Sequence, residues 1–66
     1  MRIFVNGASR DARDGLTVDA LLAELGLKER RVAVAVNHEV VPRAEHATAV
    51  VRPDDRIEIV HAVQGG

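Results

Sequence analysis

The main helical pattern in this chain is short, and its shortness constrains the fold more than any other feature. One apolar stripe is formed by residues at i, i+3, i+4 and i+7, namely Val18, Leu21, Leu22 and Leu25. Thr17 is suited to cap the start of this helix, and Gly26 to end it. About two turns of helix are not stable alone in water. The helix must therefore lie against a sheet, with its apolar stripe inward.

The first strands of that sheet are indicated at the N-terminus. Residues 1–5 alternate, which places Ile3 and Val5 on one face and Arg2 and Phe4 on the other. Asn6-Gly7 follows, and this dipeptide favours the positive φ angles of a type I′ hairpin turn. The turn predicts a returning strand over about residues 8–14, although this segment is polar. A polar strand is expected at a sheet edge, where charge discourages pairing with other chains.

The second half of the chain predicts the rest of the sheet. Residues 32–36 form a continuous apolar run, which we interpret as a central strand buried on both faces, with close packing against its alanines. Val40-Val41 predicts a brief strand that Pro42 ends. Residues 43–48 are expected to form a single helical turn, and residues 57–60 a final strand. The prediction is an α+β fold, with one helix across one face of a mixed sheet of about four to five strands.

Composition limits the classes of function that this fold can serve. A chain of 66 residues makes one small domain without room for both a core and an enclosed catalytic pocket. Nine basic and ten acidic residues leave a net charge of −1, and Phe4 is the only aromatic residue, so nucleic-acid binding is not expected. No apolar run suits a membrane span, and no signal peptide is evident. The absence of cysteine favours a reducing, cytoplasmic location.

Side chains in the body of the chain form no recognisable catalytic motif. His38, His46 and His61 have spacings that match no metal-ligand pattern, so we predict surface or structural histidines and no metal. Ser9 has no histidine nearby in sequence that could activate it. The segment 41–43, Val-Pro-Arg, could have a role, or it could be a strand end with a solvated arginine.

The end of the chain is the remaining place for chemistry. Gly65-Gly66 follows the last predicted strand, and glycines would let this backbone enter a narrow channel. The alternative is a frayed terminus or a linker remnant. We predict a domain over residues 1–62 and a flexible di-glycine tail over residues 63–66. A terminal carboxylate becomes reactive once it is adenylated, because a sulfur or amine nucleophile can then displace a good leaving group.

The chain resembles the ubiquitin-like β-grasp proteins, and among them the ThiS family, the sulfur carriers of thiamine biosynthesis. The resemblance covers the whole chain in order. It rests on residues 1–7, Thr17-Val18, Leu21-Leu22, residues 34–37, residues 40–43, Asp55, residues 57–60 and Gly65-Gly66. The segment of residues 8–14 is nearly featureless, and Gln64 stands where small residues are also common. These departures put the identity of the cognate partner in doubt more than the carrier role.

This resemblance implies a protein cosubstrate, not an enzyme. Gly66 would be adenylated by an E1-like adenylyltransferase (ThiF-like), which uses ATP, and the carrier itself would bind no cofactor. A cysteine desulfurase or other sulfur donor would then supply the sulfur of a Gly66 thiocarboxylate. Thiazole synthase (ThiG-like) would receive that sulfur. Gly65 and Gln64 would help to present the reactive end.

A partner surface is also implied, because in this fold the sheet face away from the helix meets the adenylating enzyme. Alternation places Ile57 and Ile59 on the helix side, so Phe4, Glu58 and Val60 are predicted to face outward. An exposed aromatic ring beside an apolar side chain is typical of an interface. The alternative is that Phe4 belongs to the core.

Three other functions remain open at this point. The chain could be the small subunit of molybdopterin synthase (MoaD-like), which also uses a terminal thiocarboxylate, although such chains tend to be longer. It could be a ubiquitin-like protein modifier joined to lysines through Gly66. It could also be an interaction module of the same fold, with a tail that has no chemical role.

Overall fold

The computed structural model describes residues 1–61, which form a strand-rich domain with one α-helix. The elements in order are β1 (Arg2–Val5), β2 (Ala8–Asp11), α1 (Val18–Glu24), β3 (Val32–Val36), β4 (Glu39–Val41), the 3₁₀ turn η1 (Arg43–Glu45) and β5 (Arg56–His61). The predicted α+β class is confirmed. The predicted boundary between residues 62 and 63, and the di-glycine tail, lie outside the described residues.

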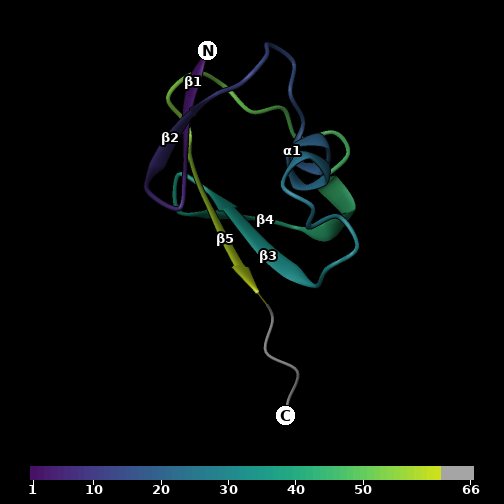
Figure 1. Ribbon diagram of the computed structural model, residues 1–66. Helices are drawn as coiled ribbons and strands as arrows, with labels where there is room; N and C mark the ends of the chain where they lie inside the picture. The colour runs from purple at the N-terminus through teal and green to yellow at the C-terminus, as the bar shows by residue number, and fades with distance from the viewer. Residues whose placement is uncertain (62–66) are drawn as a thin grey trace.

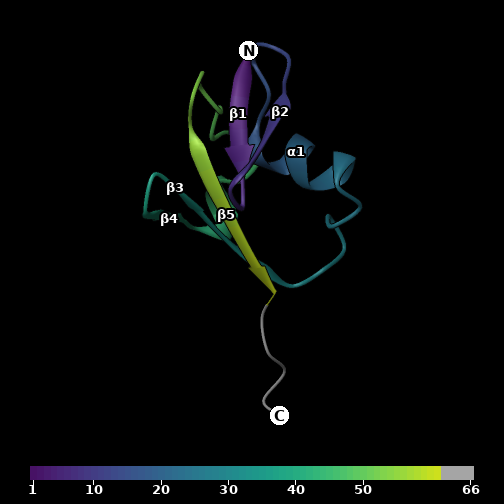
Figure 2. The same cartoon turned by 60° about the vertical axis from the view of Figure 1, so that its left-hand side comes forward.

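One mixed sheet contains all five of these strands, in the order β2-β1-β5-β3-β4. β1 and β5 are parallel, and the other neighbours are antiparallel. Figures 1 and 2 show β1 beside β5, so the first and last strands lie at the middle of the sheet. Strands that are far apart in sequence therefore form the centre of the fold.

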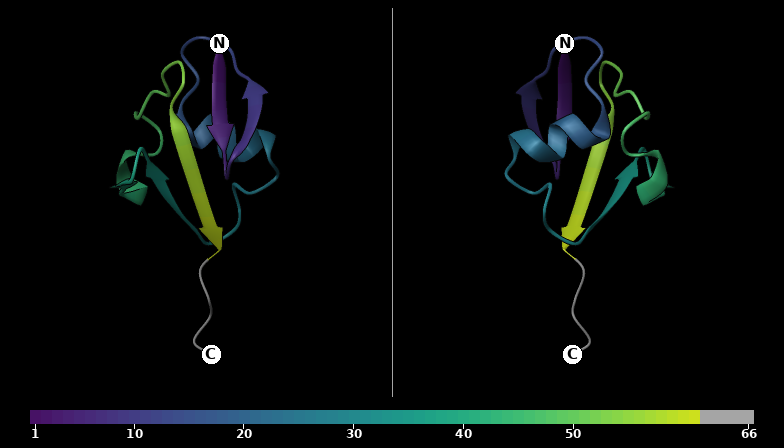
Figure 3. Two further views of the ribbon diagram at one scale, coloured as in Figure 1. Left: turned by 90° about the vertical axis from the view of Figure 1, so that its left-hand side faces the viewer. Right: turned by 90° about the vertical axis from the view of Figure 1, so that its right-hand side faces the viewer.

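Helix α1 lies across one face of the sheet (Figure 3). Its start is capped by Thr17, whose Oγ1 accepts a hydrogen bond from the Ala20 amide at 3.1 Å. Its end is followed by Gly26 at φ +73°, a left-handed conformation that glycine adopts without strain. Both predicted ends of the helix are thus confirmed. Within residues 1–61, no helix is both long enough and apolar enough to cross a membrane.

The hydrophobic core fills the space between α1 and the sheet. It consists of Ile3, Leu16, Val18, Leu21, Leu22, Val32, Val34, Val51, Ile57 and Ile59. Val18, Leu21 and Leu22 come from the helical stripe, and Leu25 packs against them half-buried. Burial of this apolar surface is what stabilises a helix of only seven residues.

Two tight turns use left-handed residues. Asn6 and Gly7 have φ angles of +50° and +86°, as the predicted type I′ turn requires. Asn37 and His38, at +52° and +70°, form an equivalent turn between β3 and β4. The strand predicted over residues 8–14 is shorter than expected and ends at Asp11. Asp11 pairs with Arg2 at the start of β1, and beyond this pair the Ala12 amide donates to the Met1 carbonyl at 2.7 Å.

The prediction for residues 32–36 was wrong in one respect. β3 lies inside the sheet, but it is not buried on both faces, because α1 covers only one of them. Val32 and Val34 point into the core, whereas Ala33 is exposed and Ala35 is half-buried. Every residue of β3 is apolar, so the sequence did not reveal that the valines at 32 and 34 point inward and the alanines point outward. The middle strand of the sheet is β5.

We expect Thr17→Ala to lower the free energy of unfolding by about 1 kcal/mol, because the Ala20 amide loses its acceptor. Thr17→Ser is the matched control, since serine keeps the capping oxygen. Urea denaturation of the three proteins measures the difference. Equal losses in the alanine and serine variants would show that the cap does not stabilise the helix.

Candidate functional site

The chain leaves the described domain through β5, the middle strand. β5 ends at His61, which pairs with Val32 at the start of β3. Figure 1 places this end of β5 at the opposite end of the molecule from the N-terminus. The predicted reactive residue Gly66, with Gly65 and Gln64, lies outside the described residues. The structure therefore defines the place from which these residues start.

The sheet face away from α1 is open and carries exposed apolar side chains. Cross-strand pairing sets Glu58, Ala35 and Val40 in one row, and Val60 beside Ala33 in the next. Val60 is 63% exposed and Val40 is 75% exposed. The small alanines form the floor of a shallow hollow between these larger side chains. We call Ala33, Ala35, Val40, Glu58 and Val60 the outer patch.

The outer patch contains two of the three residues predicted to face outward. Glu58 and Val60 are exposed, while Ile57 and Ile59 point into the core. Phe4 is on the same outer face but is half-buried. The Arg56 guanidinium carbon lies 4.9 Å from the centroid of the Phe4 ring, in a cation–π contact. Phe4 is therefore a partly covered neighbour of the patch and is absent from the buried core.

Polar side chains border the outer patch near the start of β5. The His38 Nδ1 lies 3.6 Å from the Glu58 Oε1, and both side chains are exposed. Arg56 lies between this pair and Phe4. A surface ion pair of this kind contributes little to stability. A rim of charged residues around an apolar centre is the usual composition of a protein interface.

Sequence reasoning missed two asparagine side chains that bind to β5. Asn6 accepts a hydrogen bond from the Ile59 amide at 2.8 Å and donates one to the Ile59 carbonyl at 3.2 Å. Asn37 accepts from the Arg56 amide at 2.9 Å. Each of these asparagines opens a tight turn, and the turn was the only local signal for either residue. Val40 was also missed as an outward residue, because its strand was too short to show alternation.

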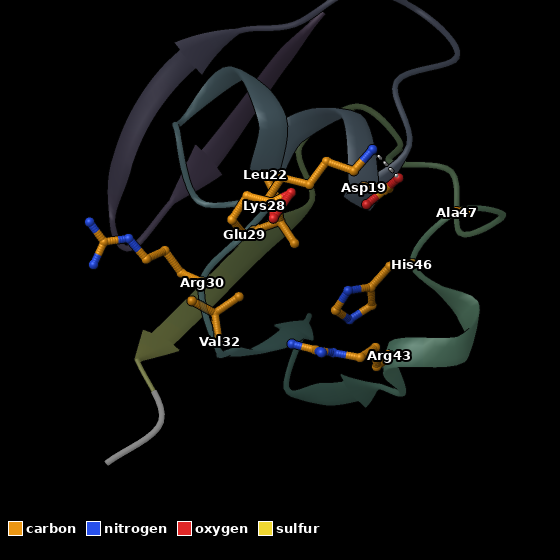
Figure 4. A pocket seen from close by; sticks show the side chains of 9 residues that line it. All are labelled: Asp19, Leu22, Lys28, Glu29, Arg30, Val32, Arg43, His46 and Ala47. Atoms are coloured by element: carbon orange, nitrogen blue, oxygen red, sulfur yellow. Dashed lines mark ion pairs between the residues drawn. The ribbon is translucent and has the colours of Figure 1, made fainter. Parts of the chain in front are cut away.

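A second hollow, of about 230 Å³, lies between α1, η1 and the start of β3 (Figure 4). His46 and Arg43 project into it, while Lys28 turns to Asp19, with 3.3 Å between Nζ and Oδ2. His46 is buried, with an exposed fraction of 7%. Its Nε2 lies 3.0 Å from the Val41 carbonyl, and its own carbonyl accepts from the Asp19 amide at 2.9 Å. His46 therefore joins η1 to β4 and to the helix, as a structural histidine.

This hollow lacks the geometry of a catalytic centre in the part of the chain that the structure describes. No hydroxyl or carboxylate among residues 1–61 hydrogen-bonds to His46, so no nucleophile–base pair forms there. His38 and His61 are exposed and lie on other elements. Within the same residues, no three His, Asp or Glu side chains are grouped as a metal site would require.

Comparisons with known proteins agree in pointing to one family. The model of the ThiS family matches residues 3–66. The chain is 32% identical to the sulfur carrier protein ThiS of Escherichia coli, with both chains covered in full. It is 42% identical over all 66 residues to part of a thiazole synthase of Paramagnetospirillum magneticum. The chain spans only 20% of the length of that thiazole synthase.

A solved structure supports the same assignment of fold. The crystal structure of the thiamine biosynthesis protein ThiS from Geobacter metallireducens is similar to this chain at a TM-score of 0.87, with 29% identity and full coverage of both chains. The predicted ubiquitin-like β-grasp fold, with one helix on one face of a mixed sheet, is confirmed by this similarity together with the strand order.

Two adjacent positions of β5 allow a test of which face of the sheet stabilises the domain. We expect Ile59→Thr to lower the free energy of unfolding by about 2 kcal/mol or more, because it puts a hydroxyl into the core. The matched variant Val60→Thr should stay within about 0.5 kcal/mol of the parent protein. Thermal and urea denaturation of both variants measure these changes in the free energy of unfolding. A large loss in Val60→Thr would mean that the outer patch is needed for folding.

Proposed function

Because this chain belongs to the ThiS family, we propose that it carries sulfur for thiazole formation in thiamine biosynthesis, on the carboxylate of Gly66. The match to residues 3–66 is the observation that carries the proposal, since it includes Gly65-Gly66. The full-length similarity to a named sulfur carrier supports it. The chain would act as a protein cosubstrate, and the catalytic groups would belong to its partners.

The proposed chemistry has three steps. The Gly66 carboxylate attacks the α-phosphorus of ATP on a ThiF-like adenylyltransferase, which forms an acyl-adenylate and releases pyrophosphate. A persulfide, supplied by a cysteine desulfurase or other sulfur donor, attacks the acyl carbon and displaces AMP. A thiol then reduces the acyl disulfide and releases the Gly66 thiocarboxylate. The need for a reducing thiol suits the cytoplasm, which keeps thiols reduced.

Dimensions of the chain fit this scheme. If fully extended, residues 62–66 would reach about 17 Å beyond β5. That length would let Gly65 and Gly66, preceded by Gln64, enter an active site while the folded domain stays outside. Glycine offers no side chain that would clash with a narrow channel. We propose residues 1–62 as the recognised domain and residues 63–66 as a flexible tail that enters the partner.

Thiazole synthase is the proposed acceptor of the sulfur. The support is that a curated thiazole synthase contains a segment 42% identical to this whole chain. A carrier-like segment and the synthase therefore occur in one polypeptide in that organism. The thiocarboxylate sulfur of Gly66 would be delivered to such a ThiG-like enzyme, and the carrier would return with a carboxylate.

The outer patch and Phe4 are proposed as the surface that binds the adenylyltransferase. Val40 and Val60 remain exposed after the core is complete, so no folding role accounts for them. The hollow over Ala33 and Ala35 could receive an apolar side chain of the partner. Glu58, with its neighbour His38, would form part of the polar rim.

Removal of Gly66 tests the carrier function directly. We expect the chain shortened by Gly66 to fold like the parent protein and to form no thiocarboxylate. Intact-mass spectrometry of the parent protein isolated from cells should show one oxygen replaced by sulfur. The same mass should establish which residue is the C-terminal one. Growth without thiamine, in a strain that lacks the native carrier, should require the parent sequence. Full complementation by the shortened chain would contradict the proposal.

The same measurements separate the other candidate functions. Covalent adducts of higher mass on other proteins would indicate a protein modifier. A thiocarboxylate that supports molybdopterin formation, with no effect on thiamine-free growth, would indicate a MoaD-like subunit. An interaction module would function without Gly66.

The outer patch can be tested with two exposed valines. We expect Val60→Asp to raise the KM of the adenylyltransferase for the carrier about tenfold, because a charge would be buried at the interface. Val50→Asp is the matched control, since Val50 is 52% exposed but is not a residue of the patch and forms a bridge with Thr17 at the start of α1. Carrier-dependent ATP–pyrophosphate exchange measures both.

Phe4→Ala completes this test, because Phe4 is half-buried beside the patch. It should weaken partner affinity as well as stability. A large loss of stability with no change in KM would remove Phe4 from the interface. Equal increases in KM for Val60→Asp and Val50→Asp would show that the outer patch does not bind the adenylyltransferase.

A further inference from the structure

The pairing between β1 and β5 ends before β5 does. The two strands pair at Phe4 with Arg56 and at Val5 with Ile57. The Phe4 amide donates to the Asp55 carbonyl at 2.9 Å, and the Asn6 amide donates to the Ile57 carbonyl at 2.8 Å. The chain then turns away at Asn6-Gly7 into β2. No further backbone group of β1 is available for the rest of β5.

Backbone groups alternate in direction along a strand, so the next ones that face β1 belong to Ile59. The Asn6 side chain satisfies both of them. Its Oδ1 accepts from the Ile59 amide at 2.8 Å, and its Nδ2 donates to the Ile59 carbonyl at 3.2 Å. A side-chain amide has the donor and acceptor of a peptide group, so Asn6 extends the ladder by one position.

Ile59 is thus the last residue of β5 that is held from both sides. Within the described residues, Val60 and His61 pair only with Ala33 and Val32 of β3. Without Asn6, both polar groups of Ile59 would depend on water, and the end of β5 could separate from the sheet more easily.

We propose that Asn6 is a positioning residue for sulfur transfer, which fixes the point where the chain leaves the sheet toward Gly66. This inference rests on the proposed function. A partner that docks on the outer patch and receives Gly66 must span a set distance between the two. If the end of β5 separated from the sheet, the free segment before Gly66 would be longer. More conformations would then be lost on binding, which would weaken the affinity for the partner.

Asn37 provides a matched control for Asn6. It too opens a turn at positive φ, and its side chain accepts from the Arg56 amide at 2.9 Å and donates to the Asp55 Oδ1 at 2.9 Å. These bonds hold the beginning of β5, whereas those of Asn6 hold its end. Glycine tolerates both turn positions, so Asn6→Gly and Asn37→Gly remove comparable side-chain bonds without strain.

Hydrogen exchange, measured by NMR on the full chain, gives a readout without a partner. We expect Asn6→Gly to raise the exchange rate of the Ile59 amide about tenfold relative to the Leu21 amide. That reference amide lies in α1 and reports global opening. Asn37→Gly should leave this ratio unchanged.

Adenylation supplies the second readout, as ATP–pyrophosphate exchange over a range of carrier concentrations with a ThiF-like enzyme. Asn6→Gly should raise the KM for the carrier about three- to tenfold with little change in kcat. Asn37→Gly should keep the parent KM. Equal KM values for the two glycine variants, or an unchanged Ile59 ratio in Asn6→Gly, would overturn the role of Asn6. A parent protein that is not adenylated would instead refute the proposed function, and the positioning role with it.

Discussion

The parallel pairing of β1 with β5 is the contact on which the rest of the structure depends. It joins the two ends of the described chain, since Phe4 pairs with Arg56 and Val5 with Ile57. The hairpin β1–β2 and the hairpin β3–β4 are local, and only β5 connects them into one sheet. Both isoleucines of β5, Ile57 and Ile59, belong to the same core cluster as the helix residues Val18, Leu21 and Leu22. The sheet and the core between it and α1 are therefore complete only when β5 is in place.

A domain of this size can cover only one face of its sheet. One helix of seven residues supplies the second layer, and the core lies entirely between the two. The other face stays open within the described chain, so Ala33 is exposed there and Ala35 is only half-buried. Val40 and Val60 expose apolar surface there that solubility alone would disfavour. Their position on one face, on the two strands that flank β3, is what makes that face the best candidate for partner binding.

Local patterns in the sequence predicted the elements well, because each depends on residues close together in the chain. Thr17 and Gly26 marked the helix ends, Asn6-Gly7 marked the first turn, and alternation gave the direction of Ile57 and Ile59. The exposure of Ala33 could not be predicted in this way. Alanine and valine both count as apolar, so the alternation along β3 was invisible in the pattern of its residues.

Features that join distant residues were beyond the same reasoning. The bonds between Asn6 and Ile59 span 53 positions in the sequence. Asn6 was expected for its backbone conformation alone, and its side-chain role depends on where β1 stops relative to β5. The turn at Asn37 carried less signal, because His38 is an unusual residue at φ +70°. The family resemblance could be predicted from the sequence, but the hydrogen bonds that hold β5 at Ile59 required the structure.

Successive side chains of β5 point to opposite faces of the sheet, and the two sets have different roles. Ile57 and Ile59 stabilise the domain, and Glu58 and Val60 between them face the proposed partner. Because these side chains share one strand, a partner that contacts Val60 would also contact the segment that ends at His61. In the proposed mechanism, recognition of the domain and delivery of Gly66 would then be coupled through β5. Such coupling requires that the strand be held up to its last positions, and the Asn6 side chain is the described group that does so at Ile59.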